Sequence, residues 1–167
     1  VVQYMCQEAL INHLNKNLGH FINIHSLERL VREHNFLLEQ SNLKIDLVEI
    51  IDNAIDIDRS LSEIKICDPA VGSGAFPMGM LNEIVNIRVF LQNYIHEKKT
   101  MYQLKLHTIT NSLYGVDLDP SAIEIARLRF WLSLIIEIDE PLPLPNLEHK
   151  LIQGNSLLTT YKGIQLF

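Results

Sequence analysis

The sequence predicts an α/β fold in which a small parallel sheet follows a helical N-terminal segment. Apolar residues recur at helical spacing through the first sixty positions, and the period changes near residue 64. From there, short apolar runs alternate with longer helical patterns in the order strand–helix–strand–helix–strand. This order is typical of parallel strands joined by right-handed crossovers. We therefore expect a helical segment over residues 1–60 and the first half of an α/β domain over residues 61–167.

Composition restricts the class of protein further. The chain has 167 residues, of which 47% are hydrophobic and 20% are charged, which excludes a disordered chain. Two cysteines exclude a disulfide scaffold, and the histidines lack the spacing of a metal site, so no metal is expected. No secretory signal or membrane-length apolar run is visible, which predicts a cytoplasmic protein without membrane contact. The net charge of −6 argues against a broad nucleic-acid surface on this segment.

Each helix of the N-terminal segment is predicted from an apolar stripe and an end signal. The first helix covers Val2–Leu14 and stops by Gly19. Ser26 is the expected N-cap of a second helix, Leu27–Leu38. A third helix is expected over Asn42–Asp56, with these residues facing inward: Leu47, Val48, Ile51, Ala54 and Ile55.

The later elements alternate between strands and helices. Ile64–Cys67 reads as a strand that ends in a glycine loop, and Cys67 is expected to be buried. Asp119 is expected to cap a helix that has Pro120 at its first position. The remaining expected elements are a helix over Ala75–Glu97, strands over Leu113–Leu118 and Lys150–Gln153, and an extended connector over 141–145. No fourth strand of the sheet is expected within these residues.

Each predicted strand ends in a polar residue: Asp68, Asp117 and Asn155. Parallel sheets bind ligands at the carboxyl ends of their strands. Gly72 and Gly74 allow a close backbone approach to a ligand, but the neighbouring Asp68 carboxylate would repel a pyrophosphate and attract a cation. A carboxylate such as Asp117 can accept both ribose hydroxyls, and the Asn155 amide can pair with adenine. Together these residues indicate an adenosine with a cationic amino-acid arm, which is S-adenosyl-L-methionine.

Three strings resemble motifs of the amino-group DNA methyltransferases. Asp68–Phe76 (DPAVGSGAF) is similar to motif I, and Gly115–Pro120 (GVDLDP) is similar to motif II. Gly154–Leu158 (GNSLL) resembles motif III of the fused, type IIG-like restriction–modification enzymes, and Val1–Met5 resembles the start of the motif X helix. The resemblance implies a partial, Rossmann-like methyltransferase sheet carrying motifs I to III, with the motif X region in residues 1–60.

The resemblance also implies a role for each matching residue in cofactor binding. Asp68 would hold the methionine ammonium group, and Gly72 and Gly74 would leave room for the methionine arm. Asp117 would bind the ribose, Leu118 would flank the adenine, and Asn155 would contact the adenine amino edge. The other residues of the expected cofactor site are Phe76, at the base of the loop, and Pro69, Ala70 and Ser156.

The implied function is adenine-N6 methylation of DNA by a restriction–modification enzyme, because motif X precedes motifs I and II. The family's Asn/Asp-Pro-Pro-Tyr/Phe motif is absent from these residues, so none of them is assigned as catalytic. We expect these residues alone to be inactive, and other parts of a larger parent to contact double-stranded DNA. An exposed sheet edge predicts a possible dimer. The alternatives are an RNA or protein methyltransferase of this fold, or a non-catalytic nucleoside-binding domain.

Overall fold

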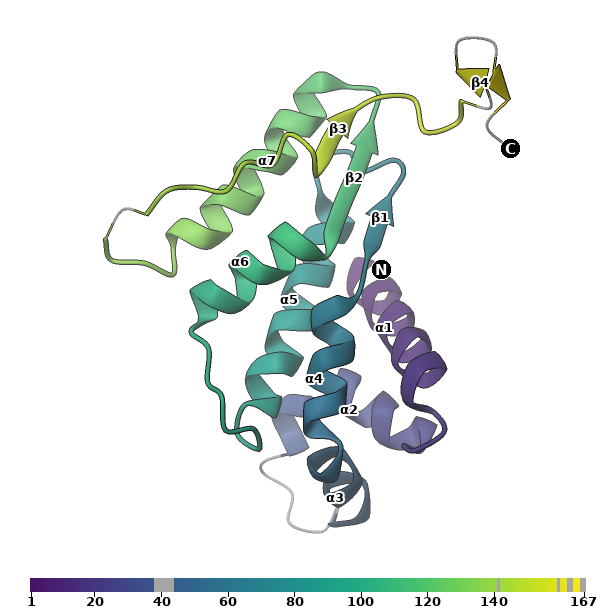
Figure 1. Ribbon diagram of the computed structural model, residues 1–167, viewed down its shortest axis with the longest axis vertical. Helices are drawn as coiled ribbons and strands as arrows, with labels where there is room; N and C mark the ends of the chain where they lie inside the picture. The colour runs from purple at the N-terminus through teal and green to yellow at the C-terminus, as the bar shows by residue number, and fades with distance from the viewer. Residues whose placement is uncertain (38–43, 141, 159, 162–163, 166–167) are drawn as a thin grey trace.

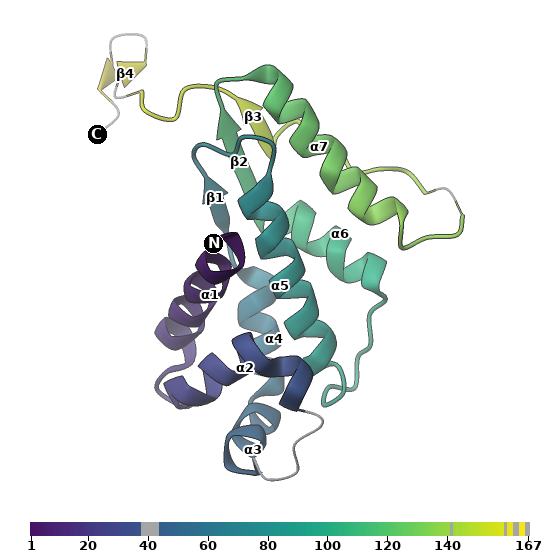
Figure 2. The ribbon, with the colours of Figure 1, turned by 180° about the vertical axis from the view of Figure 1, so that it is seen from behind.

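The computed structural model describes residues 1–37, 44–140, 142–158, 160–161 and 164–165 (Figure 1). The small sheet lies toward one end of the molecule, and the N-terminal helices lie toward the other (Figures 1 and 2). The N-terminal helices are α1 (Val2–Leu18), α2 (Ile24–Leu37), α3 (Lys44–Asp52) and α4 (Ala54–Glu63). The elements that follow are β1 (Ile66–Asp68), α5 (Ala75–Leu91), α6 (Met101–Asn111), β2 (Leu113–Asp117), α7 (Pro120–Ile135) and β3 (Leu151–Gln153).

The sheet has the order β1-β2-β3, and both of its strand pairs are parallel. The predicted parallel arrangement is therefore confirmed. Two further strands, β4 (Thr160–Tyr161) and β5 (Ile164–Gln165), form a separate antiparallel pair that was not expected. The protein is thus a mixed α/β structure with a small parallel sheet.

The described helices cover one face of this sheet and leave the other open. Leu113 and Leu151 point to the covered face and are buried; β2 packs against α5, α6 and α7, and β3 packs against α7. Side chains alternate between the faces along a strand, so Cys67 and Ile152 point to the opposite face, where both are exposed. The expectation that Cys67 is buried was wrong, because a strand position is buried only if an element packs on its face.

Helix α5 joins the two ends of the molecule. It packs against α1, α2, α4 and α6 and also contacts β1 and β2, so one continuous core runs through the described residues. At its C-terminal end, buried Arg88 donates to both carboxylate oxygens of Asp58 on α4, at 2.7 and 3.1 Å. A buried arginine held in this way fixes α5 against the N-terminal helices.

The N-terminal helices differ from the prediction at their ends. Helix α2 begins at Ile24, and Asn23 supplies the capping oxygen by accepting from the His25 N–H at 2.9 Å. Ser26, the expected cap, is instead buried within the helix and donates to the Glu49 carboxylate of α3. The polar side chain near the start of the apolar stripe was therefore a core contact and not a cap.

The predicted helix over Asn42–Asp56 is two helices that meet at Asn53, and residues 42–43 lie outside the described residues. Leu47 packs against the core and Ala54 is buried, as expected, but Val48 and Ile55 are more than half exposed. The buried residues of this segment are Ile50, Ala54, Ile57 and Leu61. These buried residues are spaced 4, 3 and 4 positions apart, so they lie on one helical face, which is not the face that was predicted from the sequence.

The longer helices are confirmed, with shifted ends. Gly19 follows α1 directly, as expected, although α1 continues to Leu18. Helix α5 ends at Leu91, six residues before the predicted Glu97. Asp119 caps α7, accepting from the Ser121 N–H at 2.8 Å, with Pro120 at the first helical position. Among the described residues, we find no helix with the length and apolar character needed to cross a membrane.

Candidate functional site

The three strands end at one edge of the sheet, and their register places the polar residues along a diagonal. Asp68 lies opposite Gly115, two residues before Asp117, and Asp117 lies opposite Gln153, two residues before Asn155. With about 3.3 Å per residue and about 4.8 Å between strands, Asp68 and Asp117 lie roughly 8 Å apart at Cα. Asn155 continues the diagonal beyond β3. The arrangement suits an elongated ligand that crosses the ends of all three strands.

The loop after β1 folds back over β2. Its first turn is closed by the Asp68 Oδ1, which accepts from the Ala70 N–H at 3.0 Å. The Val71 N–H then donates to the Val116 carbonyl of β2 at 2.9 Å. Gly72 and Gly74 have φ angles of 51° and 86°, in the left-handed region that favours glycine. The glycine spacing therefore serves the path of this loop.

Gly115 of β2 allows the loop to lie directly on the strand. A Cβ at Gly115 would lie 2.7 Å from Val71 Cγ2 and 3.0 Å from Leu151 Cδ2, too close for either contact. Val71 is 4% exposed in this position. Sequence reasoning placed Gly115 in a motif without giving it a role, although a glycine within a strand is a known signal of close approach.

Asp117 connects the ends of β1 and β2. Its Oδ2 accepts from the Gly72 N–H at 2.7 Å, and its Oδ1 accepts from the Asp119 N–H at 3.0 Å. Backbone N–H donation, from Asp119 first and Gly72 second, lowers the pKa of Asp117 below its ordinary value. The carboxylate is therefore ionised at neutral pH. An ionised carboxylate offers about four acceptor sites, so ligand hydroxyls can share it with the two N–H groups.

The end of β3 is hydrogen-bonded to the backbone at the end of β2. The Gly154 N–H donates to the Asp117 carbonyl at 2.8 Å, and Gln153 Nε2 donates to the Leu118 carbonyl at 3.3 Å. Asn155 is exposed, and its Oδ1 accepts from the Leu157 N–H at 3.0 Å. The structure thus joins Asp117 by hydrogen bonds to the loops from both neighbouring strands.

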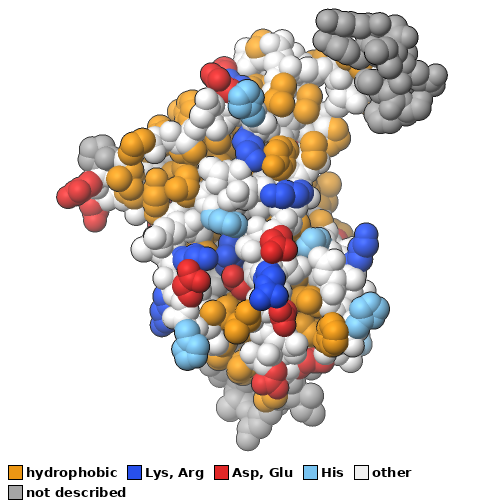
Figure 3. All heavy atoms as spheres, in the orientation of Figure 1, with side chains coloured by type: hydrophobic (Ala, Val, Ile, Leu, Met, Phe, Trp, Pro, Cys, Tyr) orange, Lys and Arg blue, Asp and Glu red, His pale blue; other side chains and the backbone are white. Residues whose placement is uncertain are grey.

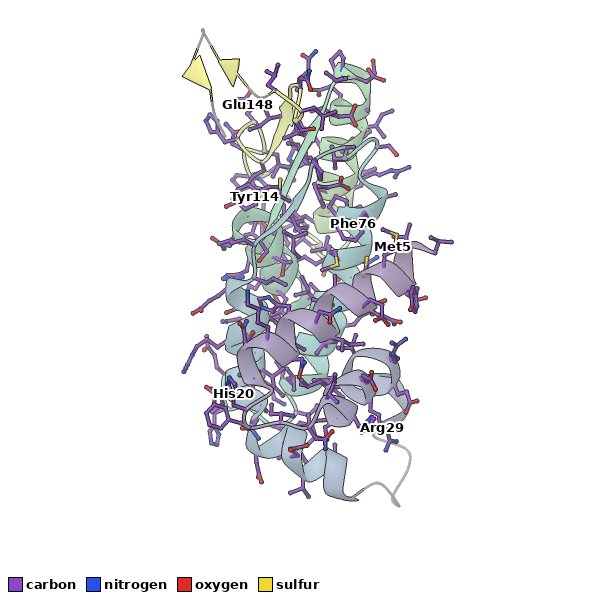
Figure 4. The ribbon with its side chains drawn as sticks, turned by 90° about the vertical axis from the view of Figure 1, so that its right-hand side faces the viewer. Met5, His20, Arg29, Phe76, Tyr114 and Glu148 are labelled. Atoms are coloured by element: carbon purple, nitrogen blue, oxygen red, sulfur yellow. The ribbon has the colours of Figure 1, made fainter. Side chains whose placement is uncertain are left out.

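The remaining predicted residues surround this centre. Phe76, in the first turn of α5, is partly buried against the core. Figure 4 shows it close to Met5 of α1, and Cys6 Sγ donates to the Phe76 carbonyl at 3.7 Å. The start of α1 therefore lies beside the start of α5. The other predicted residues are exposed: Pro69, Ala70, Leu118 and Ser156.

The described cavities lie away from these strand ends. One of about 540 Å³ is lined by residues of α1 and α4, among them Asn17, Ser60 and Arg59. Another, of about 460 Å³, lies between α7 and the segment 144–148. The candidate site is thus identified by its polar groups and its position at the strand ends, and not by a cavity.

The charged side chains on the surface and at the strand ends bear on which ligands the site can bind. Acidic and basic side chains alternate over the helical end of the molecule, and no basic patch covers the face shown in Figure 3. The part of the chain that the structure describes holds no group of three or more His, Cys, Asp or Glu side chains able to bind a metal. Two carboxylates, Asp68 and Asp117, stand at adjoining strand ends.

A parallel sheet with a glycine loop after one strand and carboxylates at two strand ends is typical of ligand-binding α/β domains. Comparison with known proteins identifies the family. Residues 47–164 match the family model described as the MmeI DNA-methyltransferase domain, and the chain belongs to that family. It is also 36% identical, over 143 residues, to a protein of Methanocaldococcus jannaschii named as a type II restriction enzyme and methyltransferase.

The match to that relative covers 82% of this chain and 11% of the relative, so the chain spans about a tenth of the length of the protein it matches. No solved structure matches this chain. The expected membership in a methyltransferase family of restriction–modification enzymes is confirmed by these comparisons.

Proposed function

We propose that this chain binds S-adenosyl-L-methionine across its three strand ends and orients it for adenine-N6 methylation of DNA. The observation that carries the proposal is the ionised Asp117 carboxylate, fixed at the end of β2 beside the glycine loop. In this proposal the sheet is part of a Rossmann-like methyltransferase domain, and the enzyme acts in the cytoplasm, where its host's DNA lies.

The residues present fit the chemistry of this cofactor. The Asp68 and Asp117 carboxylates favour a cationic ligand over a pyrophosphate, and the diagonal of strand ends suits its length. The first turn of α5 follows Gly74, contains no acidic residue and receives no side-chain cap. Its N–H groups are therefore suited to the carboxylate of the amino-acid arm.

The roles of the individual residues follow from their positions. Asp117 would bind the ribose hydroxyls, and Asp68 would attract the ammonium group. Leu118, which is 68% exposed, would cover the adenine, and Asn155 would pair with its amino edge. Bound S-adenosyl-L-methionine supplies an electrophilic methyl group. These side chains hold and orient the donor, which contributes proximity to the reaction.

The DNA part of the proposal depends on residues outside this chain. The sequence contains no Asn-Pro-Pro-Tyr-type motif, which in the resembling enzymes holds the target base. The net charge of −6 favours phosphate contacts on other parts of a longer protein. We expect this chain to bind the cofactor and to transfer no methyl group to DNA by itself.

Calorimetric titration with S-adenosylhomocysteine tests the cofactor proposal, with NAD as the comparison ligand. We expect saturable binding of S-adenosylhomocysteine, and a loss of at least tenfold in affinity in Asp117→Ala, equal to about 1.4 kcal/mol. Asp56→Ala is the matched control, because Asp56 is an exposed aspartate on α4, away from the strand ends. Equal binding of NAD, or unchanged affinity in Asp117→Ala, would contradict the proposal.

A further inference from the structure

The loop after β1 is held in two sections. Its first section is fixed to β2 by the Val71 N–H, which donates to the Val116 carbonyl, and by the buried Val71 side chain on Gly115. Its second section contains Gly72 and Gly74, the residue type with the greatest backbone freedom. A Cβ at Gly72 would meet no atom within 4 Å, so no neighbour packs against that side of the residue.

Gly74 is buried close to Ala126 of α7 and donates its N–H to the Val71 carbonyl at 2.9 Å, so only Gly72 depends on a side chain from across the sheet. Asp117 lies 45 residues after Gly72 and accepts its N–H at 2.7 Å, a short charge-assisted hydrogen bond. The same carboxylate accepts from the Asp119 N–H at the start of the α7 cap. One carboxylate therefore sets both the glycine loop and the turn after β2.

We propose that Asp117 is a positioning residue for the glycine loop as well as a ribose acceptor, so that it couples the two halves of the cofactor site. This inference rests on the proposed function for the identity of the ligand. A nucleoside bound to Asp117 further restricts a carboxylate that already holds Gly72. The loop is then ordered for the amino-acid arm, whose binding costs less conformational entropy. The two halves of the ligand should consequently bind with positive cooperativity.

Amide hydrogen exchange measured by NMR tests the anchor without any ligand. In Asp117→Ala, we expect the Gly72 amide to exchange at least tenfold faster than in the unchanged protein. The Val71 amide is the internal control, because its acceptor is the Val116 carbonyl and not a side chain. Unchanged Gly72 exchange would overturn the inference. Equal acceleration of Val71 would also overturn it, because Asp117 would then support the whole fold.

Titration with the separate halves of the ligand tests the coupling. We expect saturating adenosine to increase the affinity for L-methionine about threefold or more, and L-methionine to increase that for adenosine by the same factor. Asp117→Ala should weaken L-methionine binding although methionine does not reach Asp117. Asn155→Ala, the comparison variant, should weaken adenosine only. Independent binding of the two halves, or an unchanged methionine affinity in Asp117→Ala, would overturn the inference.

The two tests separate this inference from the proposed function. If neither half of the ligand nor S-adenosylhomocysteine binds, the proposed function fails, and Gly72 exchange still decides whether Asp117 positions the loop. If the ligands bind but Asp117→Ala leaves Gly72 exchange unchanged, the proposed function stands and the positioning role fails.

Discussion

Replacing Gly79 with alanine should destabilise the protein even though alanine is the better helix former. Gly79 lies on α5 where this helix crosses α1, and a Cβ there would lie 2.9 Å from Cys6 Sγ and 3.0 Å from Val2 Cγ1. Val2 is 37% exposed and can move aside. Cys6 is fully buried, and its Sγ is held by the Phe76 carbonyl, so the cysteine cannot move without disturbing the helix crossing.

Two opposing magnitudes decide the sign of this change. Glycine to alanine within a helix stabilises by roughly 0.5–1 kcal/mol. An additional methyl group in a packed contact costs about 1–3 kcal/mol. We therefore expect Gly79→Ala to lower the free energy of unfolding by about 1 kcal/mol. In a Cys6→Ala background the clashing sulfur is absent, and the same change should stabilise by roughly 0.5–1 kcal/mol.

Urea denaturation of the unchanged protein, Gly79→Ala, Cys6→Ala and the double variant gives the free energy of unfolding of each and the coupling between the two sites. The slope of the unfolding free energy against urea should be similar in all four, which would show that only stability has changed. If Gly79→Ala stabilises the protein equally with and without Cys6, α1 does not pack against α5 as the structure shows. The start of α1 would then be free to lie away from the glycine loop.

Three further predictions concern the ion pair, acidity and the sheet edge. Asp58→Ala should cost about 3 kcal/mol or more in urea denaturation, because it leaves the charge of Arg88 buried and unpaired; a loss below about 1 kcal/mol would contradict the pairing. Burial first, and the Arg88 charge second, lower the pKa of His107. The folded state therefore disfavours the charged imidazole, so the protein loses stability as the pH falls below about 6.5, the ordinary pKa of histidine. The melting temperature of His107→Gln should depend less on pH between 7 and 5.5, and an equal dependence would refute this. We also propose that the β1 strands of two copies pair antiparallel along their free edges, so that a short bis-maleimide links Cys67 to Cys67. Cys6 should stay unreacted, because burial raises its pKa to about 11. Absence of the cross-link at high protein concentration would exclude this dimer.

The sheet and its loops could be predicted because their signals are local. A β strand followed by an aspartate and a glycine loop, and an aspartate–proline pair before a helix, each specify their structure within a few residues. Asp119 caps α7 and Pro120 begins it, as expected. Because the strands are parallel, the three polar strand ends were also expected to meet at one edge, and they do.

The errors concern contacts between distant parts of the chain. Cys67 is exposed because no described element covers its face of the sheet, which no local pattern indicates. The break at Asn53 has no proline or glycine to announce it, and the apolar residues around it do not by themselves show which face of the segment is buried. The hydrogen bond between Gly72 and Asp117 joins residues 45 positions apart, so the motifs could identify both residues but not the contact between them.

This contact gives the acidic character of the site a physical explanation. Two carboxylates at neighbouring strand ends repel each other and also repel a phosphate, which is unfavourable for most nucleotide ligands. Backbone N–H groups of the glycine loop and of the α7 turn stabilise the charge of Asp117, so it persists without a basic side chain. A ligand that brings hydroxyls to Asp117 and a cation near Asp68 would stabilise both carboxylates further. A basic residue in either place would instead neutralise the carboxylate that the loop requires. The acidic site and the net charge of −6 agree with the proposed division of roles, in which this segment binds the methyl donor and other parts of a longer protein bind the DNA.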